Sequence, residues 1–88
     1  MAVVWIPSLL QRLTDGADKV EIPGETLRQV INNLDERFPG FKSRLIDEEG
    51  NFVEGVAIAI DGEVSHLGLL ERLGENAEVH IIPAIGGG

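Results

Sequence analysis

The chain contains no cysteine. This absence excludes a disulfide framework, a thiolate zinc site and a cysteine nucleophile, so any reactive chemistry must use another group. Basic residues are also scarce, because 7 Lys and Arg stand against 15 Asp and Glu and leave a formal net charge of -8. Binding to a nucleic-acid backbone depends on clustered Lys and Arg. We therefore expect no nucleic-acid partner, and expect instead a partner protein with a basic or mixed surface.

Long apolar runs are missing as well. No segment approaches the roughly 18 apolar residues of a membrane span, so no membrane partner is expected. The first apolar run, 2–6, follows no basic segment and ends at Pro7, which is typical of a strand and not of a signal peptide. A chain of 88 residues suits one small domain with little room for a deep catalytic pocket. These features predict a soluble, cytoplasmic protein.

The clearest pattern in the chain predicts one helix, from Thr26 to Phe38. Thr26 is a good N-cap, and Gln29 three residues later completes a capping-box pattern. Apolar residues then recur at helical spacing, at Leu27, Val30, Ile31, Leu34 and Phe38. Pro39 ends the helix, because proline disfavours helical geometry in the residue before it.

Short apolar or alternating segments predict five strands, at 2–6, 19–22, 56–60, 63–65 and 78–82. Short helical turns are predicted at 8–13 and 41–46, a loop or 3₁₀ segment at 67–73, and an exposed acidic turn at 47–51. One substantial helix among these strands predicts an α+β domain over residues 1–83, with the helix packed across one face of a mixed sheet. The strand residues expected to point inward are Val4, Ile6, Val20, Ile22, Val56, Ile58, Ile60, Val79 and Ile81.

The chain ends on Ile82-Pro83-Ala84-Ile85-Gly86-Gly87-Gly88. Proline has no N–H for a sheet ladder, so a strand that reaches Ile82 should end there. The residues after Pro83 can then project by up to roughly 17 Å, and glycine, which has no Cβ, lets such a thread enter a narrow active site of another protein. We predict that 84–88 form a flexible tail with a functional carboxylate at its end. The alternative is an ordinary frayed terminus.

Three further features accompany this ending: the order strand, strand, helix, strand, strand, strand; Phe38-Pro39-Gly40 after the helix; and the Asp61-Gly62 turn. Together with Val79-His80-Ile81-Ile82-Pro83-Ala84-Ile85-Gly86-Gly87 they resemble the ubiquitin-like sulfur-carrier family, the MoaD/ThiS family of β-grasp proteins. The resemblance covers nearly the whole chain and implies a ubiquitin-like β-grasp fold. The family usually ends on two glycines, so the chain is either used with Gly88 in place or trimmed to Gly87. The long connection before 56–60 resembles that of molybdopterin-type or cysteine-type members more than that of thiamine-type members.

The resemblance implies a carrier and not an enzyme. A partner adenylating enzyme would join the carboxylate of Gly88, or of Gly87 after trimming, to AMP with ATP and Mg²⁺, and a sulfur donor would displace AMP to leave a thiocarboxylate. The carrier itself would bind no cofactor. A downstream sulfur-acceptor enzyme or large subunit would then use the sulfur in molybdopterin or cysteine biosynthesis. The alternatives are a ubiquitin-like modifier conjugated through the same carboxylate and an interaction module whose tail is incidental.

The face of the sheet away from the helix is the expected docking surface for these partners. If 2–6, 56–60 and 78–82 are neighbours, as in β-grasp folds, that face gathers Val3, Trp5, Ala57, Ala59, His80 and Ile82. An exposed Trp among small and branched apolar residues is typical of an interface. The alternative is that Trp5 is covered by loops or faces the helix, because a register shift of one residue inverts every assignment.

Other site chemistry has little support in the sequence. His66 and His80 are 14 residues apart and lack the spacing of a zinc motif, so no metal site is expected. The acidic segment 47–49 lacks the pattern of a calcium loop. No serine lies in a nucleophile-elbow motif.

Overall fold

The computed structural model of the chain describes residues 1–83. Its strands are β1 (Ala2–Trp5), β2 (Lys19–Ile22), β3 (Ala57–Ile60), β4 (Glu63–Val64) and β5 (Glu78–Ile82). Its helices are α1 (Leu27–Arg37) and α2 (Phe41–Leu45), and its 3₁₀ segments are η1 (Ser8–Thr14) and η2 (Gly68–Leu70). The five strands and the main helix lie within one residue of their predicted ends, whereas η1 is longer than the single turn expected.

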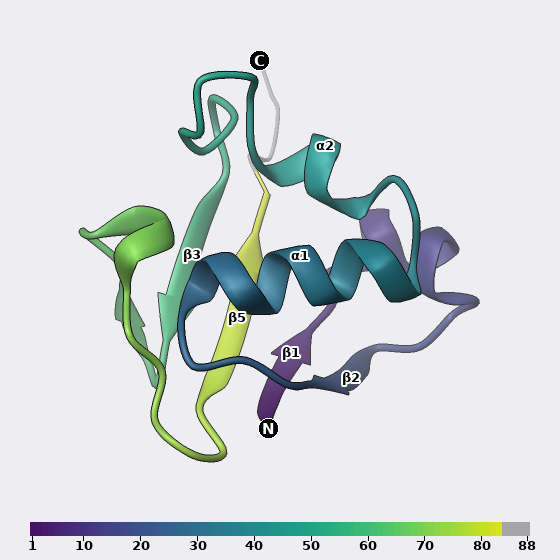
Figure 1. Cartoon of the computed structure of the whole chain (residues 1–88). Coiled ribbons are helices and arrows are strands. Elements are labelled where there is room, and N and C mark those ends of the chain that lie inside the picture. The colour runs from purple at the N-terminus through teal and green to yellow at the C-terminus, as the bar shows by residue number, and fades with distance from the viewer. Residues whose placement is uncertain (84–88) are drawn as a thin grey trace.

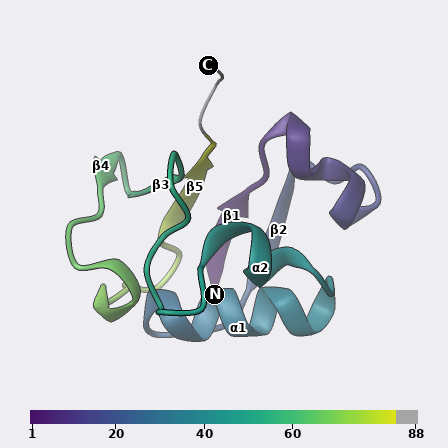
Figure 2. The same ribbon diagram turned by 90° about the horizontal axis from the view of Figure 1, so that it is seen from above.

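The strands form one mixed sheet in the order β2-β1-β5-β3-β4. β1 and β5 are parallel, and the other neighbouring pairs are antiparallel. α1 crosses one face of this sheet (Figure 1). In the view from above, α1 and α2 lie together on that side of the sheet (Figure 2). This is the predicted α+β architecture.

Local hydrogen bonds define both ends of α1. The hydroxyl of Thr26 accepts from the N–H of Gln29 at 3.2 Å, and the side-chain carbonyl of Gln29 accepts from the N–H of Glu25 at 2.7 Å. Such a cap stabilises a helix by about 1 kcal/mol. In the last turn of α1, the carboxylate of Asp35 accepts from the N–H groups of Gly40 and Lys42, which lie beyond the helix, and this fixes the start of α2.

The core lies between the sheet and the helices. α1 buries Leu27, Val30, Ile31 and Leu34, and α2 adds Phe41 and Leu45. Of the nine strand residues predicted to point inward, seven are buried, and Val56 and Ile60 are half-buried and pack against the same cluster. The predicted inward face of these strands is therefore confirmed, because a shift of the alternation by one residue would have placed these side chains on the other face.

Because β1 and β5 are parallel neighbours, the carboxyl ends of both strands lie at the same end of the sheet. η1 follows β1 there, and the chain leaves β5 beside it (Figure 2). No helix among residues 1–83 is long and apolar enough to span a membrane.

Candidate functional site

The first part of the site is the point where the last strand ends. Ile82 pairs with Ala57 as the last partner of β5, and Pro83 follows outside the strand. The prediction that pairing stops before Pro83 is confirmed, and its cause is the missing proline N–H. The predicted tail residues Ala84, Ile85, Gly86, Gly87 and Gly88 lie outside the described residues.

The second part is a row of side chains that crosses all five strands on the face away from α1, which we call the outward face. Direct cross-strand partners define the row as Lys19, Trp5, His80, Ala59 and Val64. Directly paired residues lie on the same face of a sheet. Trp5 is therefore on the outward face, and it neither faces the helix nor is fully covered by loops.

Trp5 is held in place by three neighbours. Its indole stacks on the imidazole of His80, with ring centroids 5.5 Å apart and an interplanar angle of 3°. The ammonium of Lys19 lies 5.2 Å from the ring centroid, and the indole N–H donates to a carboxylate oxygen of Glu78 at 3.0 Å. A stacked pair and an exposed cation–π contact each contribute roughly 0.5–1 kcal/mol. A side chain ordered in advance loses less entropy when a partner covers it.

The outward face changes in polarity along the strands. Ala57 and Ile82 form the apolar row next to the tail, and Ile82 is 44% exposed. On the other side of Trp5, Val3 is flanked by Glu21 and Glu78. Apolar surface therefore continues from the tail toward the indole and ends at carboxylates.

Ala59 differs from its predicted role as an exposed docking residue. It lies on the outward face as predicted, but it is only 8% exposed. Its methyl group sits between the larger side chains of its cross-strand partners His80 and Val64. Ala59 thus contributes a shallow position in the surface and little contact area of its own.

Sequence reasoning missed Val64 and Lys19 as members of this face. Val64 is 52% exposed and extends the apolar surface to the edge of the sheet. The signal was available, because Asp61 and Gly62 both have positive φ and form the two-residue hairpin loop that Asp-Gly favours. Such a loop pairs Ile60 with Glu63, and Val64 then falls opposite Ala59. Lys19 could be placed beside Trp5 only from the register of β1 against β2. The sequence does not indicate that register, because a long connection through η1 joins the two strands.

Metal-ligating groups do not gather in the described part of the chain. No group of three His, Asp or Glu side chains among residues 1–83 could hold a metal ion. His80 instead serves as the stacking partner of Trp5, and His66 lines a hollow at β4 with Val64 and Leu67. The described residues of the site therefore offer a stacked indole and apolar side chains beside the end of β5.

A model of the family described as the ThiS family matches residues 4–88. The chain belongs to the ThiS family. Both the resemblance predicted from the sequence and the predicted fold are thereby confirmed. The family model matches the chain through its last residue, Gly88, so the match includes residues 84–88.

Relatives of the chain match it over nearly their whole length. The sulfur carrier protein CysO of Mycobacterium tuberculosis is 33% identical over 89 residues, which cover 97% of this chain and 96% of that protein. The crystal structure of M. tuberculosis CysO superposes with a TM-score of 0.91 at 30% identity, over 97% of this chain and 100% of that one.

Two further solved structures share the fold. In the crystal structure of the Amycolatopsis orientalis BexX/CysO complex, one chain matches with a TM-score of 0.93 at 29% identity, and the match covers 100% of both chains. The small archaeal modifier protein 1 of Methanosarcina acetivorans matches with a TM-score of 0.82 at 23% identity, over 99% of this chain and 95% of that one. At that identity the likeness shows the fold alone. The mixed sheet with one helix across it is therefore the ubiquitin-like β-grasp of the ThiS family.

Proposed function

We propose that this ThiS-family chain is a sulfur carrier that works through the carboxylate of Gly88, or of Gly87 if the chain is trimmed. The observation that carries the proposal is the match of the family model through the last glycine. Similarity over 97% of this chain to a protein named sulfur carrier protein CysO supports it. The domain acts as a carrier and not as a catalyst.

The chemistry starts from a poor acyl donor. A carboxylate cannot release oxide, so a partner adenylating enzyme, which binds ATP and Mg²⁺, first joins a carboxylate oxygen to the α-phosphorus and releases pyrophosphate. Sulfide from a donor then attacks the acyl carbon, and AMP leaves with the bridging oxygen. The product is a thiocarboxylate, and the chain itself binds no cofactor. The carrier contributes by holding its terminal carboxylate at the active site of the partner enzyme, so that the reacting groups meet in a fixed geometry.

The fold supports this role through the end of β5. Pairing stops at Ile82, and Pro83 is the first residue outside the ladder. Five residues after Pro83 have a reach of up to roughly 17 Å, which is enough for the carboxylate to enter an active site while the domain stays on the enzyme surface. Glycines at the end of the thread leave no side chain in the channel.

The outward face is the proposed docking surface for the adenylating enzyme and for the acceptor of sulfur. Ile82 and Ala57 lie next to the tail, Trp5 and His80 form the next row, and Val3 follows. Ala59 adds a shallow position beside His80. Tryptophan is the residue most enriched at interface hot spots, and this one is stacked and hydrogen-bonded before any partner arrives.

Partner proteins are expected because a carrier must be loaded and unloaded. A relative crystallised in a BexX/CysO complex supports such an assembly. We propose an adenylating enzyme as the loading partner and a sulfur-acceptor enzyme or large subunit as the unloading partner. The sulfur would enter cysteine or molybdopterin biosynthesis.

Trapping of the acyl adenylate tests the proposal. The purified chain is incubated with an adenylating enzyme from the same genome, ATP, Mg²⁺ and hydroxylamine, which converts an acyl adenylate into a stable hydroxamate at the chain end. We expect the hydroxamate on the full chain, and none on a control shortened to residues 1–83. A chain that is never trapped contradicts the proposal. In a parallel incubation with cell extract and a sulfide source and without hydroxylamine, an amide to a protein lysine in place of a thiocarboxylate would assign the chain as a modifier.

A further inference from the structure

A groove of about 310 Å³ lies beside the point where the chain leaves the domain, and Pro83 is part of its lining. Leu45 of α2 and the inward-pointing Val56 and Ile81 form its apolar wall. These residues belong to the helix side of the sheet, whereas the next residue of β5, Ile82, belongs to the outward face. The root of the tail is therefore flanked by apolar surface on both sides of the sheet.

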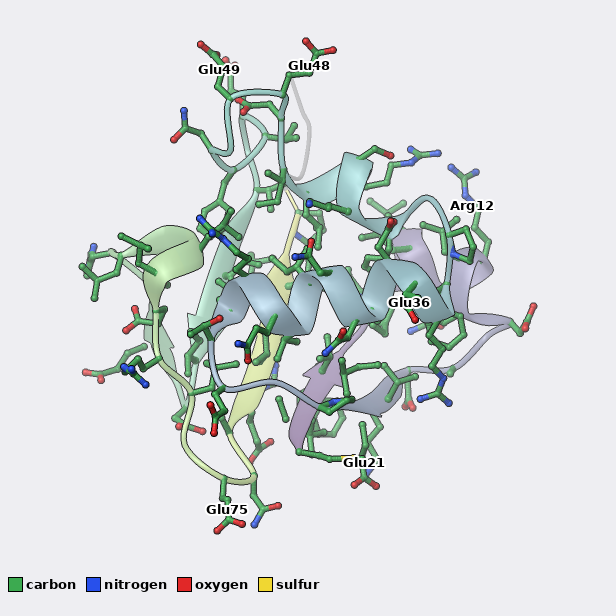
Figure 3. The ribbon with its side chains drawn as sticks, in the orientation of Figure 1. Arg12, Glu21, Glu36, Glu48, Glu49 and Glu75 are labelled. Carbon is green, nitrogen blue, oxygen red and sulfur yellow. The ribbon has the colours of Figure 1, made fainter. Side chains whose placement is uncertain are left out.

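Two guanidinium groups line the same groove. Arg12 comes from η1 and Arg44 from α2, and both side chains are exposed. The chain has only 7 basic residues and a formal charge of -8, yet no Asp or Glu is among the described residues of this lining. Figure 3 shows Arg12 beside α2, while Glu48 and Glu49 project from a separate loop above β3. The groove is thus a local cationic site on an acidic protein.

Leu9 and Leu10 of η1 also line the groove, and Leu9 is the exposed one of the two. Its side chain is 66% exposed, whereas its neighbour Leu10 is buried in the core. An exposed leucine alone needs no explanation. Here it lies with two arginines at the root of the tail, which is the combination of apolar contact and charge that recognises an acidic, apolar protein segment.

We propose that this groove receives an acidic, apolar segment of the adenylating enzyme. Apolar side chains of that segment pack on Leu9 and Ile81, and its carboxylates lie beside Arg12 and Arg44. The inference rests on the proposed function, because an enzyme that takes the tail into a channel must close around its root. Contact on the outward face alone would leave the other side of Pro83 open to water, whereas an enzyme that also fills the groove encloses the tail from both sides.

The test measures how well the adenylating enzyme recognises charge variants of the chain. The double variant R12E/R44E is compared with R28E/R72E, which changes the net charge by the same amount at two other exposed arginines. ATP–pyrophosphate exchange gives kcat and KM for each carrier, and circular dichroism confirms that both are folded. We expect a KM about tenfold higher for R12E/R44E with little change in kcat, and a KM near that of the parent for R28E/R72E, because opposed charges at an interface act mainly on association.

Two further measurements make the result specific. The KM of the parent should rise with salt, and that dependence should weaken in R12E/R44E, since exposed charge pairs are screened. Leu9→Ser should also raise KM, because it removes the apolar contact without touching the core. Equal KM values for R12E/R44E and R28E/R72E would overturn the inference, and so would a concentration-dependent dimer of the parent that R12E/R44E abolishes, since the groove would then hold a second copy.

Failure of the proposed function would look different. In that case the parent chain supports no ATP–pyrophosphate exchange with the adenylating enzyme at all. If the parent is adenylated and the two double variants behave alike, the sulfur-carrier role stands and only the groove has been assigned wrongly.

Discussion

The indole of Trp5 lies parallel to the imidazole of His80, with 3° between the ring planes and 5.5 Å between their centroids. The two residues are direct partners in the parallel β1–β5 pair, although 75 positions separate them in the chain. His80 belongs to the strand that ends at the tail, so the stack attaches the largest side chain of the outward face to that strand. Anything that binds Trp5 is held at a fixed distance from the start of the tail.

Trp5→Ser should weaken the complex with the adenylating enzyme by about 2 kcal/mol or more, because a central Trp is typical of an interface hot spot. The melting temperature should fall by several degrees, because the variant loses the stack on His80 and the cation–π contact with Lys19. The domain should stay folded at room temperature, since the ring packs on the surface of the sheet and not in the core. Isothermal titration and thermal melts measure the two effects. Leu70→Ser is the matched control, because Leu70 is exposed on η2 and lies outside the outward face. Unfolding of the Trp5 variant, or binding as tight as that of the parent, would mean that the docking surface lies elsewhere.

Gly24→Ala should destabilise the domain by about 2 kcal/mol, as expected for a forced overpacking contact. A Cβ at this position would lie 2.7 Å from a methyl group of Val30 and 2.9 Å from its backbone nitrogen, and φ is +151°. Gly74→Ala serves as the control, since nothing lies within 4 Å of its Cβ position and its φ is not in the left-handed region. Urea unfolding of both variants gives the comparison. Equal midpoints would show that the contact between the 23–24 turn and α1 is looser than the structure has it.

Thr26→Ala should lower the free energy of unfolding by about 1 kcal/mol, because it removes the N-cap acceptor of α1. The hydroxyl accepts from the N–H of Gln29 at 3.2 Å. Asn32→Ala changes an exposed residue of the same helix and should not destabilise it, since alanine is the better helix former. Chemical denaturation gives the free energy of unfolding of both variants, and equal m-values show that the midpoints can be compared directly. A Thr26 variant as stable as the parent would show that Glu25 and Gln29 suffice to start the helix.

Much of the fold could be predicted because its signals are local. Thr26 with Gln29, and Pro39 after Phe38, marked the ends of α1, and the alternation along each strand gave the inward face. Asp61-Gly62 marked the β3–β4 hairpin. The length of η1 could not be predicted, because 8–14 carries no cap or repeat that distinguishes a two-turn 3₁₀ segment from a single helical turn.

The site was only partly predictable, because its contacts join distant parts of the chain. The alternation placed Trp5 on the outward face, but its stacking on His80 and its hydrogen bond to Glu78 depend on the parallel pairing of the first strand with the last. The groove beside Pro83 joins η1, α2, β5 and the residue before β3, and no pattern within any one of them indicates it. The role of the tail came from its composition and from family resemblance.

Gly87→Val should leave the fold unchanged and block adenylation, because a branched side chain is added to a thread that must pass a narrow channel. The fold should be unaffected because the last strand ends at Ile82. Pyrophosphate release measures activation, and circular dichroism measures the fold. Ala84→Val is the control, since it adds the same side chain near the root. Normal adenylation of the Gly87 variant would show that the channel accepts a branched side chain, and the prediction would be wrong.

Mass spectrometry of the chain end tests the sulfur-carrier role most directly. The chain is incubated with the adenylating enzyme, ATP, Mg²⁺ and a sulfide source. The masses of the intact chain and of the tryptic peptide that follows Arg72 are then measured. We expect a sulfur to replace an oxygen in the last residue, which is Gly88, or Gly87 in trimmed material. Omission of ATP should prevent the exchange. An unchanged mass with an enzyme that loads another ThiS-family carrier, or sulfur found anywhere other than the terminal carboxyl group, would contradict the sulfur-carrier role.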